Sequence, residues 1–316
     1  MSDLIALAVD MGGSHAACAV VRGGEILASR NVAADGGRPL AELLPRIAEA
    51  FRELLAAQEM AASACAGFVL GFCGIVSAAE NRVLAVNGKF EDAPTLDLAS
   101  WCRREFGIRF YLENDARLAL LGESAVGAAR GASDAVMVTL GSGIGGAAML
   151  GGRLIVSRNG LAGTIGGHLP VVLGGRRCSC GNLGCAEAEA STSVLREVYS
   201  AQPGSGNGAL AGSEAIGFAE LFEAVDAGDR AARSALDHCL KVWSALTVSL
   251  IHAYDPEVVV YGGAVMKRGA DILPRLQQYV QAHAWTPGRV VPLRAASLGS
   301  DAALLGAIPL MERSRS

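Results

Sequence analysis

Apolar and polar positions along the chain predict alternating buried strands and amphipathic helices. Apolar residues recur with a period near 3.6 over residues 40–55, which predicts a helix that Pro45 either interrupts or occupies in its first turn. A longer stripe of this kind over residues 236–254 predicts a second helix, which ends at Asp255-Pro256. Short apolar runs predict strands at residues 4–9, 16–21, 68–72, 110–112, 136–140, 147–150 and 258–261. This order of elements is typical of an α/β protein.

One unit of this pattern, a strand followed by a glycine turn and a second strand, occurs twice. Residues 10–14 (Asp-Met-Gly-Gly-Ser) connect the first two predicted strands. Residues 141–146 (Gly-Ser-Gly-Ile-Gly-Gly) connect the pair at 136–140 and 147–150. Such weak internal duplication predicts two similar halves.

Composition sets limits on the class of protein. The chain has 316 residues, 51% hydrophobic and 18% charged, which is sufficient for two domains with large cores. A formal charge of -4 without a long basic block argues against nucleic acid as the main partner. The uncharged residues 60–79 are interrupted by glycine and serine, so we interpret them as a helix end and a buried strand rather than a membrane span. No secretory signal is recognisable, and we expect a cytoplasmic protein.

The glycine turns are candidate phosphate sites, because consecutive backbone N–H groups without Cβ obstruction form a concave anion-binding nest. Gly141, Gly143 and Gly146 also satisfy the dinucleotide pattern G-x-G-x-x-G. That use is disfavoured, since a strand follows the turn and no acidic residue occurs between Asp134 and Glu187. Gly262-Gly263 after a later strand strengthens the phosphate interpretation. Asp10 beside such a turn indicates a bridging cation such as Mg²⁺.

The most specific signal is a group of metal-ligand residues. His168, Cys178, Cys180 and Cys185 lie within 18 residues, and glycines 181 and 184 permit the chain reversals that a compact site requires. Three thiolates and one imidazole predict a closed tetrahedral zinc site, which is structural because no position is left for water. We expect it to fix the segment that carries Glu187.

Residues 10–14, 140–146 and 259–263 resemble the phosphate and adenosine segments of the actin-like ATPase superfamily. Within it the chain resembles the ROK family of sugar kinases and sugar-responsive repressors from residue 4 to about residue 307. The resemblance implies a two-domain α/β fold of the actin-like ATPase (ribonuclease H-like) class, with a zinc knuckle at residues 168–187. The expected domains are residues 1–115, rejoined by 299–316, and residues 116–298. Relatives are often dimers or dimers of dimers.

The resemblance also implies an ATP-dependent kinase that phosphorylates a hexose on a primary hydroxyl, O6, with Mg²⁺ beside ATP. Asp115 is the expected general base, and Asp10 orients the metal. The expected contacts to ATP and its phosphates are Asp10, Gly12, Gly13, Ser14, Gly141, Ser142, Gly143, Gly262 and Gly263. The expected sugar-binding residues are Asn87, Asn114, Asp115, His168 and Glu187.

Several residues keep a second interpretation. Asp115 is also suited to be the N-cap of the helix predicted after it. Glu113 is either part of the catalytic motif or a solvated turn residue. His15 stands where many relatives have lysine or another polar residue, and it either touches a phosphate or is exposed in the hairpin.

Two departures from the family bear on the substrate. Thr164 replaces a glutamate that family kinases use on the sugar, and one glycine is added before His168. The segment after Asn87 lacks the usual tryptophan. The alternative function is therefore a non-catalytic sugar-sensing or regulatory ROK protein. A DNA-binding repressor is not expected, because only nine residues precede Asp10, which leaves no helix-turn-helix domain ahead of it.

Overall fold

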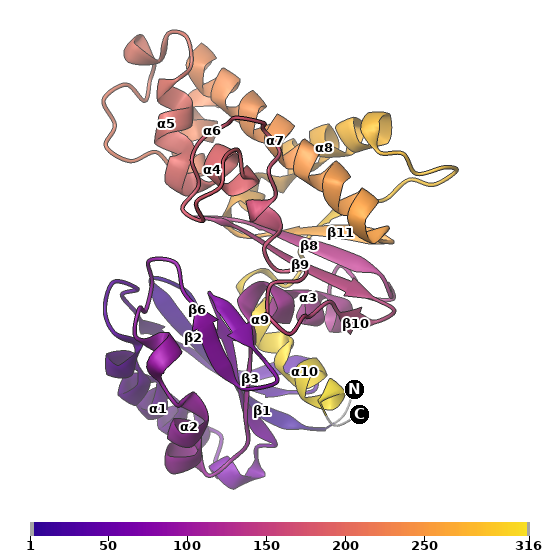
Figure 1. Cartoon of the computed structure of the whole chain (residues 1–316). Helices are drawn as coiled ribbons and strands as arrows, with labels where there is room; N and C mark the ends of the chain where they lie inside the picture. Colours follow the sequence, from indigo (N-terminus) through magenta and orange to yellow (C-terminus); the bar gives the residue numbers. More distant parts are fainter. Residues whose placement is uncertain (1–2, 315–316) are drawn as a thin grey trace. The chain divides into compact units, whose positions relative to one another are not determined.

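A computed structural model describes residues 3–314 of the chain (Figure 1). The chain forms two compact units. The first contains the chain up to Ala132, Arg153–Thr164 and the chain from Ala296 onward. The second contains Ser133–Gly152 and Ile165–Ala295. Both combine strands with helices, so the expected α/β class is confirmed.

The first unit is built on a five-stranded sheet in the order β3-β2-β1-β4-β7. Strands β1 to β3 are antiparallel, whereas β4 and β7 continue the sheet parallel to β1. The strands are β1 (Ile5–Met11), β2 (His15–Arg22), β3 (Glu25–Ala33), β4 (Gly67–Phe72) and β7 (Phe110–Asn114). A small antiparallel ribbon of β5 (Ile75–Ser77) and β6 (Arg82–Ala85) follows β4. The carboxyl ends of β1, β4 and β7 therefore meet at one edge, where open α/β sheets bind ligands.

The first unit contains several helices, of which the first two along the chain pack their apolar residues into one core with the sheet. The helices are α1 (Leu40–Ala57), α2 (Leu98–Phe106), α3 (Asp115–Val126), α9 (Ala302–Leu305) and α10 (Ala307–Arg313), with 3₁₀ turns η1 (Ala62–Ala64), η2 (Ala93–Thr95) and η7 (Gly299–Asp301). Phe51 and Phe68 meet edge to face with ring centroids 5.2 Å apart. Helix α1 continues through Pro45, its sixth residue, so neither expected effect of this proline occurs.

The division into units differs from the expected boundary after residue 115. Helix α3 belongs to the first unit, because it packs against the chain segment that returns at the C-terminus. At the closest point a Cβ on Gly122 would lie 2.0 Å from the Ala302 carbonyl oxygen, so only glycine permits this approach. The returning segment, expected from residue 299, begins at Ala296.

A second five-stranded sheet has the order β10-β9-β8-β11-β12, and strands β8, β9, β11 and β12 belong to the second unit. The strands are β8 (Ala135–Leu140), β9 (Ile144–Leu150), β10 (Arg153–Leu154), β11 (Val258–Gly262) and β12 (Leu293–Ala295). Strands β8 and β9 are antiparallel, and β11 is parallel to β8 and β12. The antiparallel start and parallel continuation repeat the pattern of the first sheet, as the duplication in sequence predicts.

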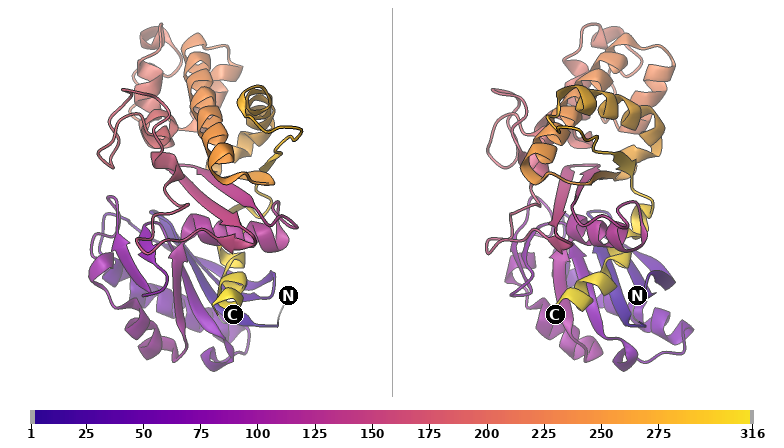
Figure 2. Two further views of the ribbon diagram at one scale, coloured as in Figure 1. Left: turned by 45° about the vertical axis from the view of Figure 1, so that its right-hand side comes forward. Right: turned by 90° about the vertical axis from the view of Figure 1, so that its right-hand side faces the viewer.

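The long helix α7 (Arg230–Tyr254) organises the helical part of the second unit. It contacts α4 (Ala186–Ala190), α5 (Leu195–Ser200), α6 (Phe218–Asp226) and α8 (Gly269–His283), which surround it in both views of Figure 2. Short 3₁₀ turns are η3 (Gly166–His168), η4 (Thr192–Val194), η5 (Ser205–Asn207) and η6 (Ala264–Arg268). Residues 3–314 include no helix long and apolar enough to cross a membrane.

Candidate functional site

The first glycine turn joins β1 to β2. Asp10 is the penultimate residue of β1, and the Gly12 N–H donates to the His15 carbonyl at 3.0 Å to close the hairpin. The segment after β3 also bonds to this turn, because the Gly36 N–H donates to the Gly13 carbonyl at 2.8 Å. His15 is exposed and its Nδ1 lies 3.2 Å from Ser14 Oγ. The turn is thus fixed by main-chain bonds with Asp10 at its base.

Asn114 and Asp115 follow at the carboxyl end of β7. Asn114, not Asp115, is the N-cap of α3, because its Oδ1 accepts from the Arg117 N–H at 3.2 Å. The Asn114 Nδ2 donates to the Gly74 carbonyl at 3.2 Å. Asp115 is the first residue of the helix, where its Oδ1 accepts from the Ala116 N–H at 2.8 Å. The N-cap interpretation of Asp115 is therefore wrong, and the Asn114 side chain hydrogen-bonds to the Asp115 carboxylate.

Asp10 and Asp115 influence one another electrostatically. Burial, together with the charge of Asp115, raises the pKa of Asp10 to about 7. Burial also raises the pKa of Asp115 to about 6, against the opposing effects of the Ala116 N–H and the Lys89 charge. Two like charges in one partly buried place resist simultaneous ionisation. A carboxylate whose pKa lies near neutrality is well matched to accept and release a proton.

Lys89, which sequence reasoning did not single out, lies against this turn. A Cβ on Gly13 would be 2.9 Å from Lys89 Cε and 3.1 Å from its Nζ. Gly13 does not adopt a positive φ, so its backbone conformation does not require glycine. The absence of a side chain matters because it lets Lys89 approach the turn. Asn87, the expected sugar contact, is exposed in the same loop two residues earlier. No periodicity or motif in the sequence indicated that Lys89 reaches residues 76 positions away.

Glu113 is 2% exposed and Arg117 is 1% exposed, and Arg117 donates to Glu113 Oε1 at 3.1 Å. The solvated interpretation of Glu113 is therefore wrong. The same guanidinium donates to the carbonyls of Gly160 and Ala162. It thereby holds the segment that leads to Thr164, whose side-chain hydroxyl is buried and has no hydrogen-bond partner within residues 3–314.

The second glycine turn is braced by a carboxylate. The Ile144 N–H donates to Glu187 Oε2 at 2.9 Å, and a Cβ on Gly143 would lie 2.4 Å from the same oxygen. The Gly141 N–H donates to the Gly143 carbonyl at 3.0 Å. Gly263 adopts φ 91° and comes so close to β8 that a Cβ would lie 2.2 Å from the Leu140 carbonyl oxygen. The fold thus brings the second turn, Gly263 and Glu187 together.

The four expected metal ligands form one cluster. Ligand atoms of His168, Cys178, Cys180 and Cys185 all lie within 4.8 Å of one another. The Sγ atoms of Cys180 and Cys185 are 3.7 Å apart, and His168 Nδ1 is 3.4 Å from Cys178 Sγ. Tetrahedral zinc with Zn–S bonds of about 2.3 Å requires sulfur atoms about 3.8 Å apart.

The backbone of this cluster has the expected reversals. Gly181 and Gly184 have φ of 91° and 70°, and a Cβ on Gly184 would lie 1.7 Å from the Val172 carbonyl oxygen. His168 Nδ1 lies 4.0 Å from Glu187 Oε1. The donor set and its spacing fit a structural zinc ion next to Glu187.

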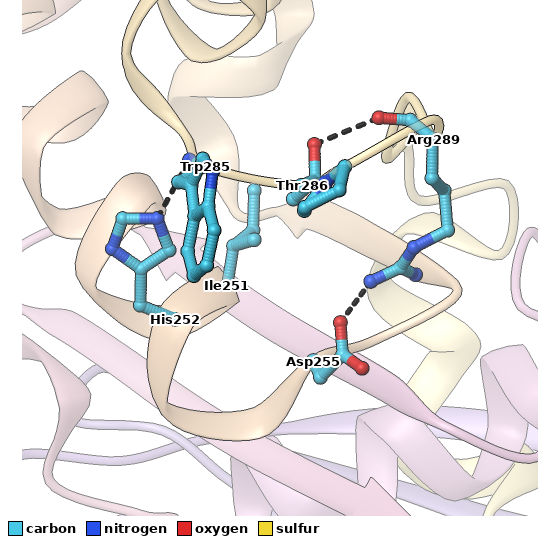
Figure 3. Close-up of a pocket in the computed structure, with 7 residues that line it drawn as sticks. Ile251, His252, Asp255, Trp285, Thr286 and Arg289 are labelled. Carbon is cyan, nitrogen blue, oxygen red and sulfur yellow. Dashed lines mark hydrogen bonds and ion pairs between the residues drawn. The ribbon is translucent and has the colours of Figure 1, made fainter.

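A separate pocket lies at the end of α7 (Figure 3). It has a volume of about 430 Å³, and its wall includes the 82% exposed Trp285. The Trp285 N–H donates to His252 Nε2 at 2.9 Å, and Arg289 pairs with Asp255. The bond from the Trp285 main-chain N–H to the His252 ring and the Arg289–Asp255 ion pair fasten the loop after α8 near the start of β11. The pocket therefore lies at the opposite end of β11 from Gly263.

These two units, each with a strand–glycine turn–strand start and parallel strands continuing its sheet, define the actin-like ATPase fold. Within that class the chain belongs to the ROK family, whose sequence profile matches residues 6–314.

Relatives agree over the full length. The glucokinase of Thermotoga maritima is 32% identical, with 99% of this chain and 98% of the relative aligned. The ROK hexokinase structure from Thermus thermophilus has a TM-score of 0.80 at 28% identity, covering 99% of this chain and 100% of that one. A ROK family glucokinase from Streptomyces griseus, solved with glucose and AMPPNP, has a TM-score of 0.78 at 28% identity and covers 97% and 98%.

Proposed function

We propose that this protein is an ATP-dependent sugar kinase that phosphorylates a glucose-like hexose or an N-acetylhexosamine on a primary hydroxyl, O6. Full-length similarity to glucokinases supports the sugar kinase class, and the complex of the Streptomyces griseus relative with an ATP analogue supports ATP as the donor. The observation that carries the proposal is the pair Asp10 and Asp115 beside the first glycine turn, with the pKa of Asp115 raised to about 6.

Asp115 is the proposed general base. Its carboxylate accepts the proton of the attacking hydroxyl while the sugar oxygen bonds to the γ-phosphorus and the bond to the β-phosphate oxygen breaks, which releases ADP. Asp10 would hold Mg²⁺, directly or through water, and the ion would offset phosphate charge. The proposed nucleotide contacts are Gly12, Gly13, Ser14, Gly141, Ser142, Gly143, Gly262 and Gly263.

The proposed sugar contacts are Asn87, Asn114, Asp115, His168 and Glu187. The Asn114 side chain caps α3, donates to the Gly74 carbonyl and also bonds to Asp115, so a sugar hydroxyl would share or replace one of these bonds. Thr164 offers a buried hydroxyl in place of a carboxylate. Exchanging a charge-assisted acceptor for a hydroxyl weakens a hydrogen bond by roughly 1–3 kcal/mol, so we expect Thr164 to shift the preference among hexoses.

The cysteine cluster is proposed to hold one structural zinc ion. Zinc there would fix the chain just before Glu187, which in turn braces the second glycine turn. Metal analysis of the purified protein should find about one zinc per chain, as four protein ligands imply. A folded sample without bound metal would contradict the zinc proposal.

The deciding experiment is ADP release from MgATP with glucose, mannose, fructose, allose, N-acetylglucosamine and N-acetylmannosamine, with Asp115→Asn as the control. Turnover on one sugar that is lost in the variant would support both the reaction and the base. Calorimetry that shows sugar binding without ADP release would favour the alternative, a non-catalytic sugar-sensing ROK protein.

A further inference from the structure

Lys89 occupies a place that two glycines leave open. Its Cε lies 2.9 Å from the position of a Cβ on Gly13, and its Cγ lies 3.0 Å from that of a Cβ on Gly36. Any side chain at either glycine would push against the lysine stem. The two glycines lie in different connections, β1–β2 and β3–α1. The space beside them that Lys89 occupies therefore forms only when the unit is folded.

The loop that carries Lys89 is anchored to the connection between β3 and α1, to the start of α1 and to Phe72 at the end of β4. The Phe90 N–H donates to the Gly36 carbonyl at 2.6 Å, and the Phe90 ring is buried with its centroid 6.2 Å from that of Phe72. Phe90 has φ 52°, a left-handed backbone conformation that is uncommon for a non-glycine residue. Asp92 accepts from the Leu40 and Ala41 N–H groups at 2.6 and 3.0 Å. These contacts fix the chain immediately after Lys89 and so restrict where the lysine side chain lies.

The charge of Lys89 reaches the carboxylates of the site. It acts to lower the pKa of Asp115, against the larger effect of burial, and acts likewise on the nearby Cys73 thiol. A lysine ammonium is a compact charge with three donors, suited to a phosphate oxygen. Lys89 thus combines proximity to the phosphate turn with proximity to the proposed base.

We propose that the Lys89 ammonium binds the phosphoryl group during its transfer, at the Gly12–Gly13 turn, which makes Lys89 a further catalytic residue. This inference rests on the kinase function proposed above. Charge on the three peripheral phosphoryl oxygens must be offset in the transition state, and a fixed ammonium does so without reorganisation. Asn87 in the same loop is a proposed sugar contact, so one loop would position acceptor and donor together.

The kinetic test is Lys89→Met, which keeps the hydrocarbon stem over Gly13 and Gly36 and removes the charge. We expect kcat to fall by about 100-fold or more, with the KM for the sugar nearly unchanged. Affinity for an ATP analogue should fall more than affinity for ADP, since the proposed contact is to the terminal phosphate. Lys89→Arg should recover part of kcat. A Lys89→Met enzyme with wild-type turnover would overturn the proposal while leaving the kinase function intact.

The chain offers a matched control because it has only three lysines, Lys89, Lys241 and Lys267. Lys241 is exposed on α7, in the second unit, so Lys241→Met should leave turnover and thermal stability unchanged. Thermal unfolding of Lys89→Met should match the wild type, which would exclude a folding defect.

A labelling experiment tests Lys89 without requiring turnover. Acetylation of the intact protein with acetic anhydride is followed by peptide mass spectrometry, with Lys241 as the internal reference. MgATP should slow acetylation of Lys89 severalfold, MgADP should slow it less, and hexose alone should not protect it. Equal labelling with and without MgATP, or protection by hexose alone, would overturn the role of Lys89. If no sugar in the panel is phosphorylated, the kinase function fails, and this experiment still decides whether Lys89 binds the nucleotide.

Discussion

The two glycine turns are similar in sequence but differ in their surroundings. The first, at Gly12 and Gly13, lies between charged side chains, with Asp10 at its base and Lys89 over Gly13. Burial and mutual repulsion raise the pKa of Asp10 to about 7. The side chains proposed to change or offset charge during phosphoryl transfer thus lie in the first unit.

The second turn, at Gly141 to Gly143, is stabilised by hydrogen bonds to fixed partners. Glu187 accepts from the Ile144 N–H, and the Thr192 N–H donates to the Gly141 carbonyl at 3.0 Å. Glu187 follows the cysteine cluster by two residues. This turn is fixed by the Glu187 carboxylate, which lies next to the candidate metal site.

The difference indicates a division of roles between duplicated elements. Both turns present backbone N–H groups suited to phosphate. Within residues 3–314, the first turn has Asp10 and Lys89 beside it, whereas the carboxylate beside the second turn, Glu187, accepts from the Ile144 N–H. We therefore expect changes at the first turn to affect kcat and changes around Glu187 to affect binding. The first prediction below tests this division directly, and the later ones test single contacts.

The largest effect is expected for Asp115→Asn, which removes the base and keeps the shape. Turnover should fall on the order of 100-fold or more, with little change in sugar affinity. Glu187→Ala is the matched change in the second unit, and the KM for the sugar should rise by about tenfold because a charge-assisted hydrogen bond is lost. Steady-state kinetics on the preferred sugar measure both. A pure KM effect at Asp115, or a pure kcat effect at Glu187, would reverse the assignment.

The next effect concerns the buried pair Glu113 and Arg117. Glu113→Gln leaves the Arg117 charge uncompensated at 1% exposure, so unfolding free energy should fall by about 3–5 kcal/mol. Adding Arg117→Met removes the stranded charge and should restore part of this loss. Urea unfolding measures both variants. If Glu113→Gln alone is as stable as the wild type, the pair does not hold the segment before Thr164.

Local patterns predicted much of this architecture. The strands, both glycine turns and the cysteine cluster were recognisable because each depends on residues close in sequence. What the sequence did not show depends on contacts across long separations. Lys89 reaches Gly13, and Arg117 reaches the Gly160 carbonyl, only after the sheet has formed.

The N-cap of α3 is a feature for which the sequence alone could not choose between two adjacent residues. Asn114 and Asp115 both favour the cap position, and the register of β7 decides between them by ending the strand at Asn114. The assignment of Asp115 as the base gains from this outcome, because the capping role falls to its neighbour.

A smaller effect is expected from pH. Because the pKa of Asp115 is raised to about 6, its basic form predominates above this pH and is lost below it. The kcat/KM for the sugar should therefore fall about tenfold per pH unit on the acid side of pH 6. Asp10, whose pKa is raised to about 7, contributes its own acid step, so Asp115→Asn should lose only the step near pH 6. A limb centred near the ordinary aspartate value of 3.8 would show that burial does not tune this group.

The smallest effect is expected for Asp92→Ala. Asp92 accepts from the first two N–H groups of α1, whose own N-cap residue, Pro39, supplies no side-chain bond. Losing such a cap costs about 1 kcal/mol, or roughly 2–4 °C in Tm. Asp92→Asn, which retains an acceptor oxygen, should recover most of that stability. Because the same loop carries Lys89, Asp92→Ala should also lower kcat modestly, and it should not do so in a Lys89→Met background. If the losses in kcat are additive in the double variant, Asp92 and Lys89 act independently. That result would argue against a role of this loop in positioning Lys89 at the first turn.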